Sequence, residues 1–294
     1  SSERAVMILP ILSILPLTRV RLFIARILYF LVGLFLPSRH VVVRRRGITY
    51  DLDLSEGIDL SIYLLGSYQP HVVTNPFYQI PENACIFDIG ANMGCMTLQF
   101  AREASSGHVY AFEPTDFAYM KLLSNMDLNP ALKERITPVK NFASDRSMNP
   151  PRPFAMASWK TDRFTSKGHP VHGGIERKTS FASCVTLDDF CRENRIQGVD
   201  LIKIDTEGQE LAVLKGARNT LQTFRPVVVF ETGQYQLEEH NVSFQNFKDI
   251  FDPLGYRLIC LQRSMEITPD NVASLIPVKS TVDILALPDQ KEQP

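Results

Sequence analysis

The stretch that decides the fold is residues 84–94, ACIFDIGANMG, an apolar run that ends in an acid, Asp88, and two spaced glycines, Gly90 and Gly94. A short apolar run that closes on a glycine is typical of a buried parallel strand. The glycines allow the backbone to turn tightly and to approach a ligand closely. Residues 97–104 then predict a helix, whose first N–H groups can bind an anionic group. Because ligands bind at the carboxyl ends of the strands in open α/β sheets, we expect a nucleotide-like ligand here.

The next apolar run, residues 109–113, predicts a second strand that closes on Glu113. A carboxylate at this position can accept the hydroxyls of a ribose. Dinucleotide-binding enzymes share this arrangement, but their fingerprint is Gly-x-Gly-x-x-Gly. The present loop begins with an acid and lacks the central glycine. The acid at Asp88 would repel a pyrophosphate and can meet an amino group, so the pattern favours S-adenosylmethionine. An NAD-type dehydrogenase is the alternative.

Strand-like and helix-like stretches alternate along the chain, which predicts an α/β fold with a doubly wound, seven-stranded sheet. The seven predicted strands are 84–88, 109–113, 136–142, 199–205, 226–231, 256–261 and 282–287. The last two have only a short turn-like stretch between them, too short for an ordinary crossover helix. We therefore expect an antiparallel hairpin at one edge of the sheet.

Length and composition limit the domain organisation and the class of partner. A chain of 294 residues holds one large α/β domain and an appendage. We expect a catalytic domain over 83–290, with an insertion or lid at 143–185, and a lead-in strand and helix over 46–82. A net charge of −1 provides no basic field for nucleic acid. Five cysteines without a CxxC pair argue against disulfides and zinc ribbons, and they indicate reduced thiols on the cytoplasmic side.

The N-terminal segment 1–45 is apolar and basic, and it predicts a helical extension. Its uncharged runs, 6–18 and 27–37, are each shorter than the roughly 20 residues that a spanning helix needs. We therefore expect a peripheral membrane anchor, with the arginines at 44–46 near anionic headgroups. A pair of helices that pack on the protein itself is the alternative.

Carboxylates follow two further strands at the edge where the ligand is expected. Asp205 ends the fourth strand and Glu231 the fifth, with Glu207 and Glu210 between them. A hydroxyl acceptor needs a group that removes its proton, so Asp205 is a candidate base or substrate contact, with Glu231 and Glu207 as further catalytic residues. The same oxygens could hold a divalent cation. A structural alternative assigns Glu207 and Glu210 to capping the next helix, and His240 is an outside candidate for the base.

Several of these stretches together resemble the FkbM-type methyltransferases. The resemblance covers roughly 48–287 and lies in FDIGANMG at 87–94, FEP at 112–114, LDDF at 187–190 and, most specifically, IKIDTEGQE at 202–210. The lead-in at 58–70 also resembles the family. The first 45 residues lie outside it. The resemblance implies a class I, Rossmann-like methyltransferase fold and O-methylation of a hydroxyl on a sugar, glycan, glycolipid or related small molecule.

The resemblance also implies further cofactor contacts. Pro114 is expected near the adenine, and the segment that contains Ala143 and Ser144 is expected at its edge. The full set of predicted cofactor-binding residues is Asp88, Gly90, Ala91, Asn92, Gly94, Glu113, Pro114, Ala143 and Ser144. A catalytically silent, membrane-associated protein that keeps this fold is the remaining alternative.

Overall fold

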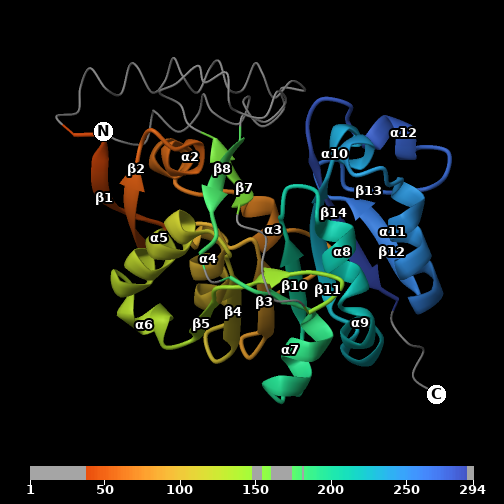
Figure 1. The fold of residues 1–294 in the computed structure, drawn as a ribbon, viewed down its shortest axis with the longest axis horizontal. Helices are drawn as coiled ribbons and strands as arrows, with labels where there is room; N and C mark the ends of the chain where they lie inside the picture. The colour runs from red at the N-terminus through yellow and green to blue at the C-terminus, as the bar shows by residue number, and fades with distance from the viewer. Residues whose placement is uncertain (1–37, 148–153, 160–173, 181, 290–294) are drawn as a thin grey trace.

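The computed structural model describes residues 38–147, 154–159, 174–180 and 182–289 (Figure 1). The predicted helical extension therefore lies outside the described residues, except for its end. That end, 40–45, is a strand and not a helix, because alternate side chains from Val41 to Arg45 lie against the protein while the others face solvent. Within the described ranges, no helix is long and apolar enough to cross a membrane.

An eight-stranded sheet forms the centre of the fold, in the order β13-β12-β14-β11-β10-β3-β4-β5. The strands from β5 to β11 are parallel, whereas β14 runs antiparallel to both of its neighbours. The strands are β3 Cys85–Ile89, β4 His108–Phe112, β5 Ile136–Val139, β10 Leu201–Ile204, β11 Val227–Thr232, β12 Tyr256–Cys260, β13 Met265–Glu266 and β14 Val282–Pro288. The doubly wound sheet is confirmed, and the two-residue strand β13 adds to the seven expected strands.

The antiparallel pairing of the last two long strands is also present, but β14 lies inside the sheet. It inserts between β11 and β12, so its residues pair with both. Chain order reverses between β3 and β10, because β4 and β5 extend to one side of β3 while β10 and β11 extend to the other. This reversal is the place where α/β sheets of this type bind ligands.

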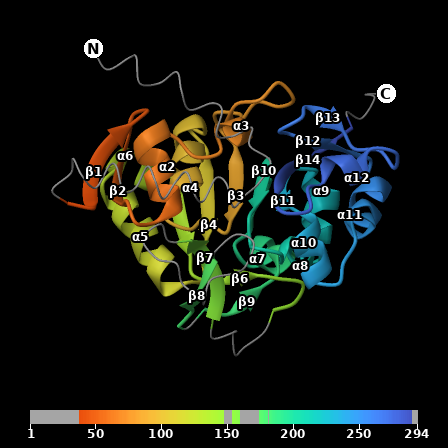
Figure 2. The same ribbon diagram turned by 90° about the horizontal axis from the view of Figure 1, so that it is seen from above.

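Helices cover both faces of the sheet (Figure 2). On one face lie α2 Gly57–Leu65, α4 Cys95–Glu103 and α5 Asp116–Asp127, which bury side chains in one apolar core. On the other face lie α7 Leu187–Glu193, α8 Glu210–Lys215, α9 Arg218–Phe224 and α11 Phe244–Phe251, which bury a second core. The other helices in the described ranges are α3 Pro70–Val73, α6 Pro130–Lys133, α10 Gln234–Glu239 and α12 Val272–Leu275, with a 3₁₀ turn at Asp252–Leu254.

The lead-in forms a small antiparallel ribbon beside the main sheet. Its strands are β1 His40–Arg45 and β2 Ile48–Asp53. The Arg45 guanidinium donates hydrogen bonds of 3.2 and 3.1 Å to the carbonyl of Tyr63 and lies over its ring. The Arg45 side chain therefore binds Tyr63 of the same chain. This contact corrects the expectation that Arg45 faces lipid headgroups.

The described parts of the segment predicted as an insertion carry four short strands. β6 Phe142–Ala143 pairs with β9 Cys184–Val185, and β7 Phe154–Trp159 pairs with β8 Gly174–Lys178. One predicted helix, 210–221, is divided into α8 and α9. A Cβ at Gly216, between them, would lie 2.0 Å from the carbonyl oxygen of Ser144, so the insertion packs directly on this break.

Candidate active site

The loop between β3 and α4 packs against the end of β10. Gly90 has a φ of +83°, and a Cβ on it would lie 1.9 Å from the carbonyl oxygen of Asp205. The amides of Gly90 and Ala91 both donate to the carbonyl of Phe112 at 2.9 Å. Gly94, with a φ of +85°, precedes α4 and packs against Leu122. The loop is therefore fixed between β4 and β10, and its first two amides are already engaged within the protein.

Asp88 lies at the end of β3, as predicted, but its carboxylate is fully buried. The Thr97 hydroxyl of α4 donates to its Oδ2 at 2.6 Å. Its Oδ1 is 3.9 Å from Nζ of Lys203 and has no hydrogen-bond partner among the described residues. Burial raises the pKa of this carboxyl above its usual range, although Lys203 opposes the shift. One oxygen of Asp88 thus holds the helix N-terminus, and the other is available to a buried donor.

Glu113 connects the second strand to the glycine-containing loop. Its Oε2 accepts the amide of Asn92 at 2.9 Å, and its Oε1 accepts the amide and hydroxyl of Thr115 at 2.9 and 2.5 Å. Burial raises its pKa, and these hydrogen bonds oppose the shift. A carboxylate has about four acceptor sites, and three are filled here. The sequence predicted that Glu113 accepts both ribose hydroxyls. A single acceptor site remains, on Oε2, so Glu113 can accept one of the two hydroxyls.

A buried lysine joins the two halves of the site. Lys203 of β10 is 3% exposed, and its Nζ donates to Oδ2 of Asp205 at 3.2 Å. Burial alone would lower the pKa of Lys203, but the carboxylates of Asp205 and Asp88 raise it above its usual value. The lysine is therefore a fixed cation between the end of β3 and the end of β10.

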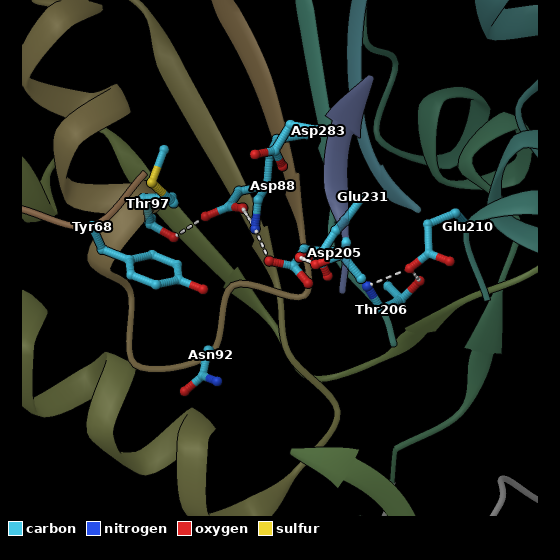
Figure 3. A network of polar contacts seen from close by, with 12 residues as sticks. Tyr68, Asp88, Asn92, Thr97, Asp205, Thr206, Glu210, Glu231 and Asp283 are labelled. Carbon is cyan, nitrogen blue, oxygen red and sulfur yellow. Dashed lines mark hydrogen bonds and ion pairs between the residues drawn. The ribbon is translucent and has the colours of Figure 1, made fainter. Parts of the chain in front are cut away.

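Three carboxylates form a row across β10, β11 and β14. Glu231 pairs with Asp283 in the register of β11 and β14, and Asp205 occupies the same level after Ile204, which pairs with Phe230. Side chains alternate along a strand, and Lys203 and Asp205 share a face, so the row lies on the side of the sheet covered by α2 and α4. We call Asp205, Glu231 and Asp283 the acidic row (Figure 3).

Burial and mutual repulsion control protonation in this row. The pKa of Glu231 is well above its usual range because the group is buried and faces Asp205, Glu207 and Asp283. Its Oε1 accepts the hydroxyl of Thr281 at 2.5 Å. Burial, together with Asp205 and Glu210, raises the pKa of Glu207 to about 8. Neutral carboxyl groups can donate a hydrogen bond as well as accept one.

Glu210 stabilises the start of a helix, which agrees with the structural alternative that assigned it to capping α8. Its Oε1 accepts the amide and hydroxyl of Thr206 at 2.9 and 3.0 Å and the amide of Gly208 at 3.2 Å. These contacts close the turn before α8. His240, the outside candidate for the base, packs on this turn. A Cβ at Gly208 would lie 2.3 Å from Nε2 of His240. The Nδ1 of His240 is 3.3 Å from the side-chain Nε2 of Gln209.

The remaining predicted contacts are less closely joined to the site. Ser144 donates its amide to the carbonyl of Val185 at 3.0 Å and contacts Gly216, while Ala143 belongs to β6. Pro114 directly follows Glu113 after the end of β4. Among the described residues no group of three or more His, Cys, Asp and Glu side chains has the arrangement of a metal site.

The lead-in contributes residues that sequence reasoning did not select. Tyr68 is directed toward Asp205 (Figure 3), and its pKa is raised by burial and then by Asp205, Glu231 and Asp283. His71 of α3 contacts Asp283 at 2.6 Å, and Gln262 donates to the same oxygen at 2.7 Å. The only sequence signal was the family-like lead-in, which carried no chemical assignment.

Residues 88–258 match the model of the methyltransferase FkbM domain. The chain belongs to this family. This FkbM-family chain is 27% identical over 199 residues to Methyltransferase sdnD of Sordaria araneosa, a match over 58% of the chain and 77% of that protein. It is 27% identical over 149 residues to the Hexuronic acid methyltransferase AglP of Haloferax volcanii, over 50% of the chain and 56% of that relative. The solved structure of methyltransferase FkbM from Methylobacillus flagellatus KT is similar with a TM-score of 0.44 and 18% identity, over 78% of this chain and 53% of that one.

The family match places part of the site outside the shared domain. The FkbM domain begins at Asp88 and ends at 258, so it contains Glu113, Asp205 and Glu231. The lead-in and β14 lie beyond these limits, although β14 supplies Asp283 of the acidic row and the lead-in supplies Tyr68 and His71 beside it. The chain spans about half the length of AglP and of the solved FkbM structure.

Proposed function

We propose that this protein transfers the methyl group of S-adenosylmethionine to a hydroxyl of a sugar, glycan, glycolipid or related small molecule. The observation that carries the proposal is the position of the acidic row, which begins at Asp205 and contacts the glycine-containing loop through Gly90. A cofactor held by that loop would present its reactive end to these carboxylates. Methyl transfer needs chiefly an acceptor oxygen held in line with the methyl group.

The residues of the loop fit the proposed cofactor. Oδ1 of Asp88 is buried and accepts no hydrogen bond within the described residues, so it can accept one from the amino group of the methionine moiety. The remaining acceptor site of Glu113 suits one ribose hydroxyl. The positive φ values of Gly90 and Gly94 allow the loop to turn tightly between β3 and α4, where the cofactor would bind. S-adenosylmethionine supplies an electrophilic methyl group on a sulfonium.

In this proposal the acidic row binds the acceptor. Asp205, held by Lys203, accepts a hydrogen bond from a hydroxyl next to the reacting one and so orients the acceptor. Glu207 and Glu231, whose raised pKa values favour the neutral form, donate hydrogen bonds to neighbouring acceptor oxygens. A divalent cation between the carboxylates is the alternative arrangement, and chelation by EDTA distinguishes the two: loss of activity that Mg²⁺ restores would support the cation.

One of the relatives supports a carbohydrate as the methyl acceptor. AglP is a hexuronic acid methyltransferase by name, and a hexuronic acid offers both hydroxyls and a carboxylate to a row of hydrogen-bonding groups. The proposal also includes the part of segment 1–45 that precedes β1 as a peripheral anchor at the cytoplasmic side of a membrane. That part rests on the apolar and basic sequence and on the reduced cysteines.

Two measurements test the function. Isothermal titration with S-adenosylmethionine should give one saturable site, and titration with NADH should give none. Incubation with S-adenosylmethionine and methyl β-D-glucuronoside, alongside neutral glycosides, should then add one methyl group detectable by mass spectrometry. Mild alkali cleaves a methyl ester but not a methyl ether, so it shows whether the carboxylate or a hydroxyl was the acceptor. NADH binding without S-adenosylmethionine binding would overturn the proposal in favour of a dehydrogenase.

A further inference from the structure

A short part of the lead-in crosses the carboxyl edge of the sheet. At one end, the carbonyl of Tyr68 accepts the side-chain amide of Gln99 in α4 at 3.3 Å. Three residues later, His71 contacts Asp283 of β14 at 2.6 Å. The helix α4 follows the glycine-containing loop, whereas β14 is the third strand beyond β3 in the sheet. The segment therefore passes from the proposed cofactor side to the far end of the acidic row.

His71 and Asp283 form a supported dyad at that far end. The Nε2 of His71 lies 2.6 Å from Oδ2 of Asp283, whose side chain is only 6% exposed. The amide of Gln262 donates to the same Oδ2 at 2.7 Å, and its Oε1 accepts the backbone N–H of Asp283 at 3.0 Å. Asp283 is thus fixed from two directions. A carboxylate that accepts one ring N–H of a histidine fixes the tautomer and stabilises the imidazolium form.

The other nitrogen of the ring is available. The His71 side chain is 36% exposed. Within the described part of the chain, its Nδ1 makes no hydrogen bond, and its only polar contacts are those of Nε2 with Asp283 and Gln262. With the proton on Nε2, Nδ1 carries a lone pair. The dyad adjoins Glu231, because Glu231 and Asp283 are paired across β11 and β14.

We propose that His71 is the general base that removes the proton of the acceptor hydroxyl, with Asp283 as its positioning residue. This inference rests on the proposed function. As the hydroxyl oxygen forms its bond to the methyl carbon, the carbon–sulfur bond breaks and its electron pair stays on sulfur, giving S-adenosylhomocysteine. The hydroxyl proton passes to Nδ1, and the resulting imidazolium is stabilised by Asp283 until solvent takes the proton. Neither residue belongs to the shared FkbM domain, so the base would be supplied by the flanking parts of the chain.

Neighbouring side chains are consistent with this assignment of the proton. Glu231 and Glu207 have raised pKa values, so near neutral pH they already carry a proton and cannot accept the one from the hydroxyl. Burial and the facing carboxylates also raise the pKa of Tyr68, which keeps its phenol neutral. Asp205 is bound to Lys203. A neutral imidazole accepts a proton on its bare ring nitrogen, which in His71 is Nδ1 when Nε2 donates to Asp283.

The first test measures the tautomer and needs no acceptor. Long-range ¹H–¹⁵N spectra of the whole protein, loaded with S-adenosylmethionine, should show His71 protonated on Nε2 and bare on Nδ1. The signals are assigned by their loss in His71→Ala. The substitution Asp283→Asn should shift His71 toward a mixture of tautomers. A proton on Nδ1 in the wild-type protein would overturn the proposal, whatever the acceptor is.

The second test is chemical rescue of methyl transfer to methyl β-D-glucuronoside. His71→Ala should lower kcat about 100-fold or more, leave the Kd for S-adenosylmethionine unchanged, and recover about tenfold with added imidazole. His108→Ala, in which the lost histidine bonds Thr137 at the opposite edge of the sheet, is the matched control and should show no rescue. Unchanged kcat in His71→Ala would overturn the proposal while leaving the function intact. Absence of S-adenosylmethionine binding in the wild type would instead overturn the proposed function.

Discussion

The carbonyl oxygen of Asp205 occupies the space that a side chain on Gly90 would need, with only 1.9 Å between that oxygen and a Cβ at Gly90. Gly90 also has a left-handed φ of +83°. These two facts join the end of β3 to the end of β10. The glycine-containing loop and the first acid of the acidic row therefore have one fixed separation, and they meet at the point where strand order reverses.

Gly90→Ala should abolish binding of S-adenosylmethionine, because the new Cβ must displace the backbone of Asp205 and adopt a strained φ. We expect a loss of about 2–4 kcal/mol in the free energy of unfolding, as for other severe backbone substitutions. Gly198→Ala is the matched control, since a Cβ there meets nothing within 4 Å. Titration calorimetry and urea unfolding measure the two effects, and normal binding by Gly90→Ala would contradict the interpretation.

Glu113→Gln should weaken S-adenosylmethionine binding by about 10- to 100-fold, the size of a lost hydrogen bond to a charged group. The Gln side chain brings an amide donor toward the N–H of Asn92 or Thr115, both of which now donate to the carboxylate. Glu134→Gln changes an exposed glutamate and should bind normally. Equal affinities for the two variants would show that Glu113 has no part in the cofactor site.

Lys203→Met should destabilise the fold by about 3–5 kcal/mol, because it leaves the buried carboxylate of Asp88 and the partly buried carboxylate of Asp205 without their cation. Lys215→Met changes an exposed lysine of α8 and should alter stability by less than about 0.5 kcal/mol. The difference is measurable by urea unfolding. A second substitution, Asp88→Asn, should restore part of the stability of Lys203→Met, and the absence of any restoration would argue against a direct charge interaction.

Glu207→Gln should make the protein more stable at pH 8 than the wild type. Burial raises the folded-state pKa of Glu207 from 4.5 to about 8, so the folded protein keeps a proton that the unfolded chain releases above pH 4.5. Stability from this group is therefore complete below pH 4.5 and is lost as pH rises through 8. Glutamine has no such proton to lose.

Thermal unfolding from pH 5 to pH 8 measures this effect. We expect the Tm of Glu207→Gln to exceed that of the wild type by about 2–4 °C at pH 8, equivalent to about 1 kcal/mol, and to match it near pH 5. Glu193→Gln, at an exposed glutamate that ends α7, should follow the wild-type curve at both pH values. Parallel curves for wild type and Glu207→Gln would mean that Glu207 ionises normally.

Much of the fold was predictable because its main strands are apolar and end in recognisable residues. The run before Asp88 and the run before Glu113 gave strands and their order along the chain. The helix break at Gly216 was not predictable, since glycine is tolerated inside helices and the carbonyl of Ser144 that packs on Gly216 is distant in the sequence. The position of β14 between β11 and β12 was also not predictable from the sequence, because the packing of whole strands decides which of them pair.

The sequence by itself determined the doubly wound sheet and the family, and it located the glycine-containing loop and Glu113, because periodicity, glycine positions and strand-end acids are local signals. Only the tertiary structure decided that Lys203 joins Asp88 to Asp205 and that Asp283 extends the acidic row. It also brought His71 to Asp283 across 212 positions of the chain. The physical reason is that such side chains carry no pattern of their own, and their chemistry depends on which strands and helices the folded core places next to each other.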